Sequence, residues 1–311
     1  MRIVFMGTPE FAVPSLRILH EHKYDIAAVV TAPDKPRGRG LRVSVTPVKE
    51  FALKSGCTVL QPEDLKNPGF LATLTSLKPD LMIVVAFRIL PKEVFSLPGR
   101  GSFNLHASLL PKYRGAAPIN WAIINGEIET GVTTFFLREK VDTGSVILQA
   151  RVRIGQDETA GDLHDKLADV GAEIVLQTVR LIELGRAQTR PQDDSLASPA
   201  PKIFKEHCRI DWSKKAAEIH NFVRGLSPTP CSWTVHKGKT LRIFRTMVHG
   251  LKDGLRVSSP GEIVEVSTNS LVVNTGNGVL DVRELQLEGK NRLPVEEFLR
   301  GYPVKAGGRF E

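Results

Sequence analysis

The chain has 311 residues, a formal net charge of +8, and 41% hydrophobic and 24% charged residues. This length and composition predict a globular protein of two domains and exclude a low-complexity chain. No apolar run approaches the length of a membrane-spanning helix, and the first residues read as a strand, so we expect neither a membrane segment nor a signal peptide. The three cysteines, Cys57, Cys208 and Cys231, have neither disulfide-framework nor zinc spacing, which indicates a reducing, cytoplasmic environment.

Apolar strands alternate with amphipathic helices over the first two-thirds of the chain. This alternation predicts βαβ units and a Rossmann-like α/β domain with a mostly parallel sheet. The continuous apolar run at 80–86 indicates a strand buried on both faces. We expect further strands near 3–6, 26–31, 58–60, 102–106, 133–137 and 146–152, and helices near 9–21, 47–54 and 160–184.

The pattern changes after residue 185, where polar residues and prolines predict a linker. A helix near 214–224 and five short alternating segments follow, which predict a small antiparallel, OB-like β-barrel. We therefore expect a catalytic domain over 1–189, a linker over 190–207 and a barrel domain over 208–311. The barrel strands are expected near 232–236, 241–245, 261–266, 271–273 and 279–285.

Positive charge is concentrated in two places. Residues 202–256 carry 12 Lys and Arg against 4 Asp and Glu, and the loop 34–42 carries 4 cations and 1 acid. A local excess of this kind favours a polyanion such as nucleic acid, because phosphate contacts release counterions. The alternative is a solvated basic surface that only aids solubility.

The most informative stretch combines an amide, an imidazole and a carboxylate. Asn104 and His106 are two residues apart at the end of a predicted strand, so their side chains share one face. Asp142 follows in a turn-like tetrapeptide. An amide can donate to a developing oxyanion, an imidazole can accept a proton or hold one beside the oxyanion, and a carboxylate can orient the imidazole. Because this set contains no nucleophile, it favours direct transfer between two substrates.

Each of these residues also has an ordinary structural interpretation. Asn104 and His106 could satisfy buried backbone groups, and an Asp in a turn usually bonds its own backbone. A single His supplies too few ligands for a metal site. Residues 7–12 contain one Gly where a dinucleotide fingerprint has three, so a dinucleotide cofactor is not predicted.

Taken together, the motifs resemble those of the folate-dependent formyltransferases. The shared pattern is Asn-x-His, Ser-Leu-Leu-Pro and Asp-x-Gly, and the similarity extends over most of the chain. It is carried by Gly7–Ala12, Pro33–Gly40, Asn104–His106, Ser108–Pro111, Arg114–Ile119, Asp142–Gly144 and Ile210–Trp212. The resemblance implies a Rossmann-like catalytic domain followed by a barrel, with 10-formyltetrahydrofolate as the formyl donor and no metal.

Within that family, the two basic regions resemble those of members that formylate the methionine carried by initiator tRNA. The resemblance implies Asn104, His106 and Asp142 as catalytic residues. It implies folate contacts from Phe87, Ser108, Leu109, Leu110, Pro111 and Val141. It implies tRNA contacts from Lys35, Arg37, Arg39, Arg42, Lys202 and Lys205. We also expect a monomer, independently of the resemblance. The loop 86–91 is one residue shorter than the family pattern and lacks its Gly, so we expect a different pocket wall there.

Four alternatives share part of this pattern. Glycinamide ribonucleotide formyltransferases are shorter and open with a phosphate loop that Gly7–Ala12 does not match. Sugar-nucleotide formyltransferases are not expected to carry the basic loop or a basic barrel. A formyltetrahydrofolate hydrolase would need no polyanion surface, and a non-catalytic RNA-binding protein would have no need of the intact trio.

Overall fold

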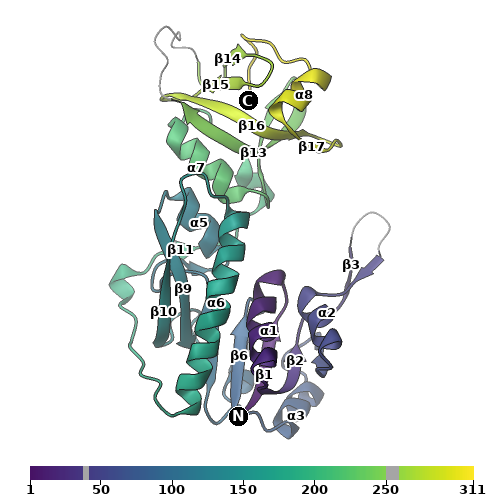
Figure 1. Ribbon diagram of the computed structural model, residues 1–311, viewed down its shortest axis with the longest axis vertical. Helices are drawn as coiled ribbons and strands as arrows, with labels where there is room; N and C mark the ends of the chain where they lie inside the picture. Colours follow the sequence, from purple (N-terminus) through teal and green to yellow (C-terminus); the bar gives the residue numbers. More distant parts are fainter. Residues whose placement is uncertain (38–41, 250–258) are drawn as a thin grey trace. The chain divides into compact units, whose positions relative to one another are not determined.

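The computed structural model describes residues 1–37, 42–249 and 259–311. The chain divides into two compact units (Figure 1). Unit 1 comprises Met1–Gly115, Thr130–Val152 and His164–Ala200, and unit 2 comprises Ala116–Glu129, Arg153–Leu163 and Pro201–Glu311.

Unit 1 is built on a mostly parallel sheet, which confirms the Rossmann-like prediction. Among the described residues it has seven strands in the order β10-β9-β7-β6-β1-β2-β5. The five strands from β7 to β5 run parallel, and β9 runs antiparallel to β7. The bounds are β1 (Arg2–Gly7), β2 (Asp25–Val30), β5 (Val59–Leu60), β6 (Leu81–Val85), β7 (Ser102–His106), β9 (Glu129–Phe136) and β10 (Val146–Arg153).

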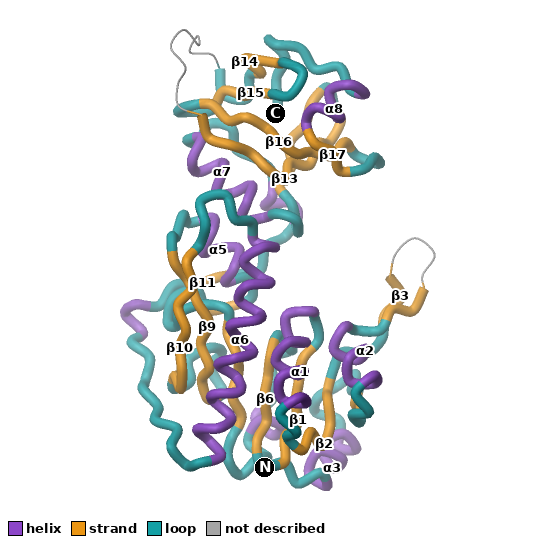
Figure 2. Tube along the Cα trace, in the orientation of Figure 1, coloured by secondary structure: helices purple, strands orange, loops and turns teal. Residues whose placement is uncertain are grey.

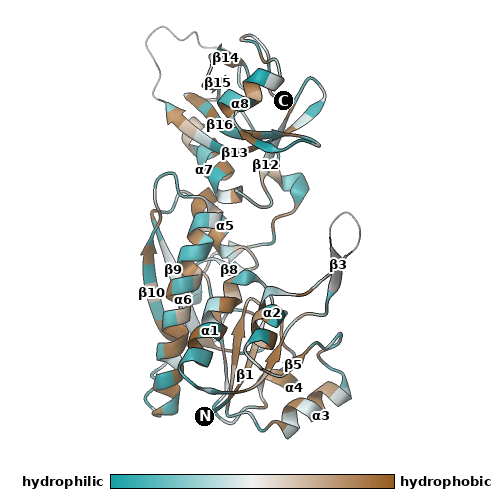
Figure 3. Ribbon diagram, turned by 45° about the vertical axis from the view of Figure 1, so that its right-hand side comes forward, coloured by the Kyte–Doolittle hydropathy of each residue, from teal (hydrophilic) through white to brown (hydrophobic). Residues whose placement is uncertain are grey.

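Helices cover both faces of this sheet because successive strand residues point to opposite sides. On one face, Val4 and Met82 pack in a buried cluster with Phe70 of α3 and Val94 of α4. On the other face, Gly171 of α6 lies so close to Leu105 that a Cβ atom would be 2.7 Å from the Leu105 Cδ2. Figure 3 shows the strands around β1 in the brown of hydrophobic residues. The helices are α1 (Val13–Glu21), α2 (Pro47–Lys54), α3 (Pro68–Ser76), α4 (Lys92–Phe95) and α6 (Ala160–Glu183).

The basic loop between β2 and α2 contains two short strands that the sequence did not predict. β3 (Lys35–Arg37) and β4 (Arg42–Ser44) pair antiparallel. After them, Thr46 caps α2 by accepting a hydrogen bond from the Lys49 N–H at 3.1 Å, and Pro47 occupies the first turn. A side-chain cap and an N-terminal Pro explain why α2 begins where predicted.

Unit 2 holds an antiparallel sheet, in agreement with the predicted small barrel. The strand order is β12-β13-β16-β15-β14, and β17 pairs with β16. Figure 2 shows these strands in orange, with the neighbouring α7 and α8 in purple. The elements are α5 (Pro118–Ile124), α7 (Ala216–Leu226), β12 (Ser232–His236), β13 (Lys239–His249), β14 (Ile263–Val266), β15 (Leu271–Asn274), β16 (Val279–Leu287), β17 (Arg292–Pro294) and α8 (Val295–Gly301).

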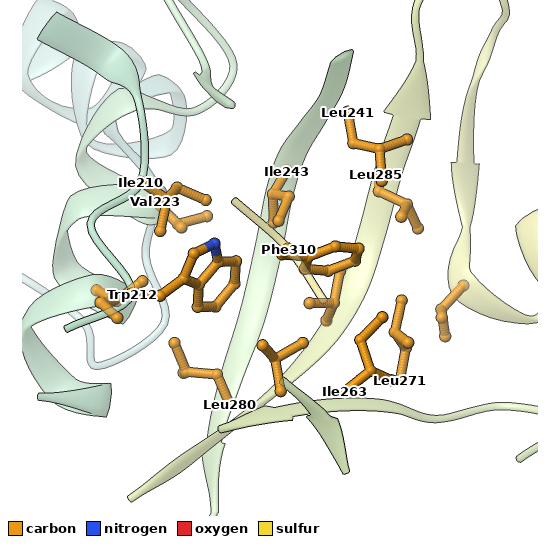
Figure 4. Packing of buried hydrophobic residues seen from close by; sticks show 14 of the residues in the cluster. Ile210, Trp212, Val223, Leu241, Ile243, Ile263, Leu271, Leu280, Leu285 and Phe310 are labelled. Carbon is orange, nitrogen blue, oxygen red and sulfur yellow. The ribbon is translucent and has the colours of Figure 1, made fainter. Parts of the chain in front are cut away.

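Aromatic packing closes the core of this sheet (Figure 4). The rings of Trp212 and Phe310 lie 5.7 Å apart between centroids, and both side chains are buried. The indole Nε1 of Trp212 donates to the Thr234 Oγ1 at 3.0 Å, so its polar atom is satisfied inside the core. Residues 210–212, which carry part of the family resemblance, therefore contribute packing to unit 2.

The polar segment 185–200 is hydrogen-bonded to unit 1. Arg190 forms an antiparallel bridge with Val146, and β11 (Pro199–Ala200) pairs parallel with β8 (Arg114–Gly115). The first half of the predicted linker thus has fixed neighbours in the site region. Across the described residues, none of the helices is both long and apolar enough to cross a bilayer.

Candidate active site

The carboxyl end of β7 carries two of the predicted catalytic side chains. Leu105 packs against α6, so the alternation of the strand turns Asn104 and His106 to the opposite face. β7 lies directly beside β6, and its carboxyl end is at the edge where parallel sheets bind their ligands. Local strand geometry therefore places the amide and the imidazole on one side, as the spacing predicted.

His106 is buried, with both ring nitrogens facing acceptors. Its Nε2 lies 2.8 Å from the carbonyl oxygen of Tyr113, and its Nδ1 lies 3.9 Å from the Oδ2 of Asp142. A carbonyl can only accept, so Nε2 carries a hydrogen. Nδ1 is then the nitrogen that can gain or lose a proton, and a proton there would sit beside a carboxylate.

Asp142 is held by a residue distant in sequence. Its Oδ2 accepts a hydrogen bond from the Gly115 N–H at 2.9 Å. Its backbone is in the left-handed region at φ 56°, which L-residues seldom adopt. The carboxylate is thus hydrogen-bonded to Gly115 and faces His106, and the self-bonded turn considered as an alternative is not the arrangement found.

The carboxamide of Asn104 is half-buried and has no hydrogen-bond partner among the residues that the structure describes. A polar group kept in this state is available to a ligand. Asn104 can therefore donate to a substrate oxygen without first breaking a bond within the protein.

The predicted folate turn, Ser108 to Pro111, is tied to β9 and β10. The hydroxyl of Thr133 donates to the Ser108 carbonyl at 2.6 Å and accepts from the Leu110 N–H at 3.1 Å. The Gln149 Nε2 donates to the Leu110 carbonyl at 2.8 Å, and Arg190 donates to the Gln149 Oε1. Ser108 and Leu110 are buried, so they shape this turn from within.

Two other predicted folate residues come from separate loops. Phe87 follows Ala86, whose φ is 48°, and the Arg88 guanidinium lies over its ring at 5.3 Å. Ile89 of the same loop is 75% exposed. Val141, next to Asp142, is also exposed. Within the described part of the chain, no hydrogen bond, ion pair or ring contact joins Phe87 or Val141 to His106.

The predicted tRNA residues lie in both units. Lys35 and Arg37 lie in β3, and Arg42 lies in β4. Arg39 lies outside the described residues. In unit 2, Lys202 and Lys205 are exposed. The Lys202 ammonium lies 5.2 Å from the centroid of the Phe204 ring.

Three groups that hold His106 and Asp142 could not be singled out from the sequence. These are the Tyr113 carbonyl, the Gly115 N–H and the side chain of Gln192, whose Nε2 donates to the Asp142 carbonyl at 2.8 Å. Two of them are backbone groups, which every residue possesses. The third is a Gln in a polar segment, where Gln is common.

The chain matches proteins of known family along almost its whole length. Residues 1–179 match the formyl transferase domain, and residues 202–303 match the formyl transferase C-terminal domain. It is 48% identical to the methionyl-tRNA formyltransferase of Acetivibrio thermocellus, covering 99% of this chain and 98% of that protein. It is 50% identical to the methionyl-tRNA formyltransferase of Chlorobium limicola, covering 97% of this chain and 96% of that protein.

Solved structures share the fold at lower identity. The sugar 3N-formyltransferase WlaRD, crystallised with dTDP and 5-N-formyl-THF, is 21% identical with a TM-score of 0.69, covering 94% of this chain and 99% of that one. HypX from Aquifex aeolicus is 20% identical with a TM-score of 0.68, covering 98% of this chain and 49% of that one. With both domains matched in order and close relatives over nearly all of its length, this chain belongs to the formyl transferase family.

Proposed function

We propose that this protein transfers the formyl group of 10-formyltetrahydrofolate to the α-amino group of methionine on initiator tRNA. The observation that carries the proposal is the near-full-length similarity, 48–50% identical, to proteins named for that reaction. The basic stretch at 202–256 supports a polyanionic partner. We place the protein in the cytoplasm, where initiation takes place, and expect it to act as a monomer.

In this proposal the methionyl amine attacks the formyl carbon directly. A new C–N bond forms, the bond between the formyl carbon and the folate nitrogen breaks, and that nitrogen leaves with a proton. Asn104 donates to the formyl oxygen as it becomes an oxyanion. Loss of one such donor costs roughly 10²–10³ in rate.

His106 accepts the proton of the attacking amine at Nδ1, because Nε2 is already hydrogen-bonded to the Tyr113 carbonyl. The resulting imidazolium is stabilised by Asp142, which lies 3.9 Å away. That distance is too long for a direct hydrogen bond. When His106 takes up the proton, Nδ1 and the Asp142 Oδ2 therefore move closer together, or a substrate group bridges them. General acid–base help of this kind contributes about 10²–10⁴ in rate.

Ser108 to Pro111 would line the tetrahydrofolate site together with Phe87 and Val141. The bonds from Thr133 and Gln149 support this role because they fix the shape of the turn. Lys35, Arg37, Arg39 and Arg42 would meet the acceptor end of the tRNA. Lys202 and Lys205 would contact its phosphates.

The test offers formyl-labelled 10-formyltetrahydrofolate with either Met-charged initiator tRNA or an amino-sugar nucleotide. Label is expected on the tRNA alone, and label only on the sugar would overturn the proposal. Ala substitutions of Asn104, His106 and Asp142 are then assayed singly, with Lys66→Ala as an exposed control. Each of the three is expected to lower kcat by at least about 10²-fold. Near-normal turnover in H106A would refute the assigned roles.

A further inference from the structure

Gln192 lies between the two ranges that match the family domains, in the segment whose composition predicts a linker. Its side chain reaches the turn that carries Asp142. We propose that Gln192 is a positioning residue: it fixes this turn so that the Asp142 carboxylate is placed against His106. The inference rests on the proposed function, because it assigns Gln192 to the same formyl transfer.

All four hydrogen-bonding capacities of the Gln192 amide are used. Its Nε2 donates to the carbonyl oxygens of Asp142 and Gly144, both at 2.8 Å. Its Oε1 accepts hydrogen bonds from the Arg114 Nε at 3.1 Å and from the Arg114 Nη2 at 2.7 Å. Carbonyls only accept and a guanidinium only donates, so the orientation of the amide is unambiguous. No other residue type offers two donors and one acceptor oxygen at this length.

Arg114 anchors the arrangement from the opposite side. Its Nη2 also donates to the Asp194 Oδ1 at 2.7 Å, so the same segment holds the guanidinium at a second point. The next residue, Gly115, supplies the N–H that binds the Asp142 Oδ2. Arg114 and Gly115 form β8, which pairs with β11 at the end of the segment. Asp142 is therefore held through its backbone by Gln192 and through its side chain by Gly115.

The turn needs this external support because its own conformation is unfavourable. Asp142 adopts φ 56°, in the region that favours glycine. Gly144 is packed directly against the Phe136 carbonyl, with no room for a Cβ atom. Without the two bonds from Gln192, the turn could relax and carry the Asp142 carboxylate away from Nδ1 of His106, which it now faces across 3.9 Å.

Two substitutions separate the parts of the arrangement. Gln192→Met keeps the length and removes every polar contact. Gln192→Glu keeps the size and the contact to Arg114 but replaces both donors with an oxygen facing two carbonyls. Gln188→Met is the matched control, because Gln188 is an exposed Gln in the same segment and forms no hydrogen bond with the described residues.

We expect both Gln192 variants to lower kcat, by up to about 10²-fold, as a displacement near 1 Å does at a catalytic group. The KM for the folate donor should change less than kcat, because the turn at 108–111 is held by Thr133 and Gln149 and only Val141 among the proposed folate contacts lies beside Asp142. Q188M should match the wild type.

The decisive measurement combines each change with Asp142→Asn. If Gln192 acts through the Asp142 carboxylate, its substitution should cost little once that carboxylate is gone. An equal fold-loss in the D142N background, or wild-type kcat in both single variants, would overturn the inference. A general loss of folding would appear as that equal fold-loss.

Rates are measured with whichever acceptor the wild-type protein formylates, Met-tRNA or an amino-sugar nucleotide. If the protein formylates the sugar alone, the proposed function is overturned, but the coupling between positions 192 and 142 can still be measured. A protein that formylates Met-tRNA but shows no coupling between positions 192 and 142 overturns this inference alone.

Discussion

Gly144 lies against the carbonyl of Phe136 so tightly that its position excludes any side chain. Gly144→Ala must therefore displace either β9 or the turn that carries Asp142. We expect a loss of about 1–3 kcal/mol in the free energy of unfolding, as for other overpacked sites. The kcat should fall by roughly 10²-fold if the turn moves by about 1 Å. Urea unfolding and steady-state kinetics measure the two effects.

Gly99→Ala is the control for this substitution. Gly99 is exposed, and a Cβ atom there would meet nothing within 4 Å. It should leave both quantities unchanged. A G144A variant with normal activity would show that the position of the turn does not matter for the reaction.

The neutral imidazole of His106 is expected to carry its hydrogen on Nε2. The reason is the 2.8 Å contact with the Tyr113 carbonyl, which can only accept. Nitrogen chemical shifts of ¹⁵N-labelled histidine, recorded on the unliganded protein at high pH, report the tautomer directly. Asp142→Asn should leave the tautomer unchanged, because Tyr113 fixes it. A hydrogen found on Nδ1 would contradict the proton path proposed above.

The stability of unit 2 should fall in mild acid because of His220. Burial lowers the pKa of His220 below its ordinary value of 6.5, against the opposing hydrogen bond to the Gln156 carbonyl. Arg224 lowers this pKa further, and Asp157 raises it. As the pH falls, the unfolded chain takes up the proton before the folded protein does. The contribution of neutral His220 to stability is therefore fully present above about pH 6.5 and is lost as the pH falls towards the pKa of the folded state.

Thermal unfolding from pH 7.5 to pH 5 tests this expectation with His220→Gln. The variant should be less stable at pH 7.5, since the bond between the His220 Nδ1 and the Thr246 Oγ1 is lost. Its stability should change less steeply with pH, by up to about 1.4 kcal/mol per pH unit. Parallel curves for the two proteins would exclude His220 as the titrating group.

Binding of tRNA should depend on salt through the exposed lysines of unit 2. We expect Lys202→Ala and Lys205→Ala each to weaken binding for all tRNA sequences alike and to reduce the slope of log K against log salt by about 1. Lys66→Ala, an exposed change in unit 1, serves as the control. Filter binding at several salt concentrations gives the slopes. Slopes equal to that of the wild type would remove both lysines from the interface.

Much of the fold followed from local patterns. The bounds of β7 and α2 agree with the prediction to the residue, because alternation defines one and a capped, proline-led start defines the other. The helices α5 and α8 were missed. Each has only seven residues, too few for a periodic pattern to stand out.

Residues of the candidate site could be proposed from the sequence only where the side chain itself carries the chemistry. Asn104, His106 and Asp142 are distinctive residue types at distinctive spacings, and the structure brings Asp142 to His106. The groups that hold His106 and Asp142 are different. Tyr113 and Gly115 contribute backbone atoms, and Gln192 joins the site through contacts across 50 and 78 residues. Such long-range pairing depends on tertiary structure, which periodicity and composition do not encode.

The bonds made by segment 185–200 bear on how this protein could be divided or recombined. A fragment ending after α6 at Glu183 would keep every proposed catalytic side chain, yet it would lack Arg190, Gln192 and β11. Engineers exchanging residues 201–311 for another module should therefore place the junction after Ala200. A junction placed at the end of α6 would remove the residues that hold the Asp142 turn and Gln149 in place.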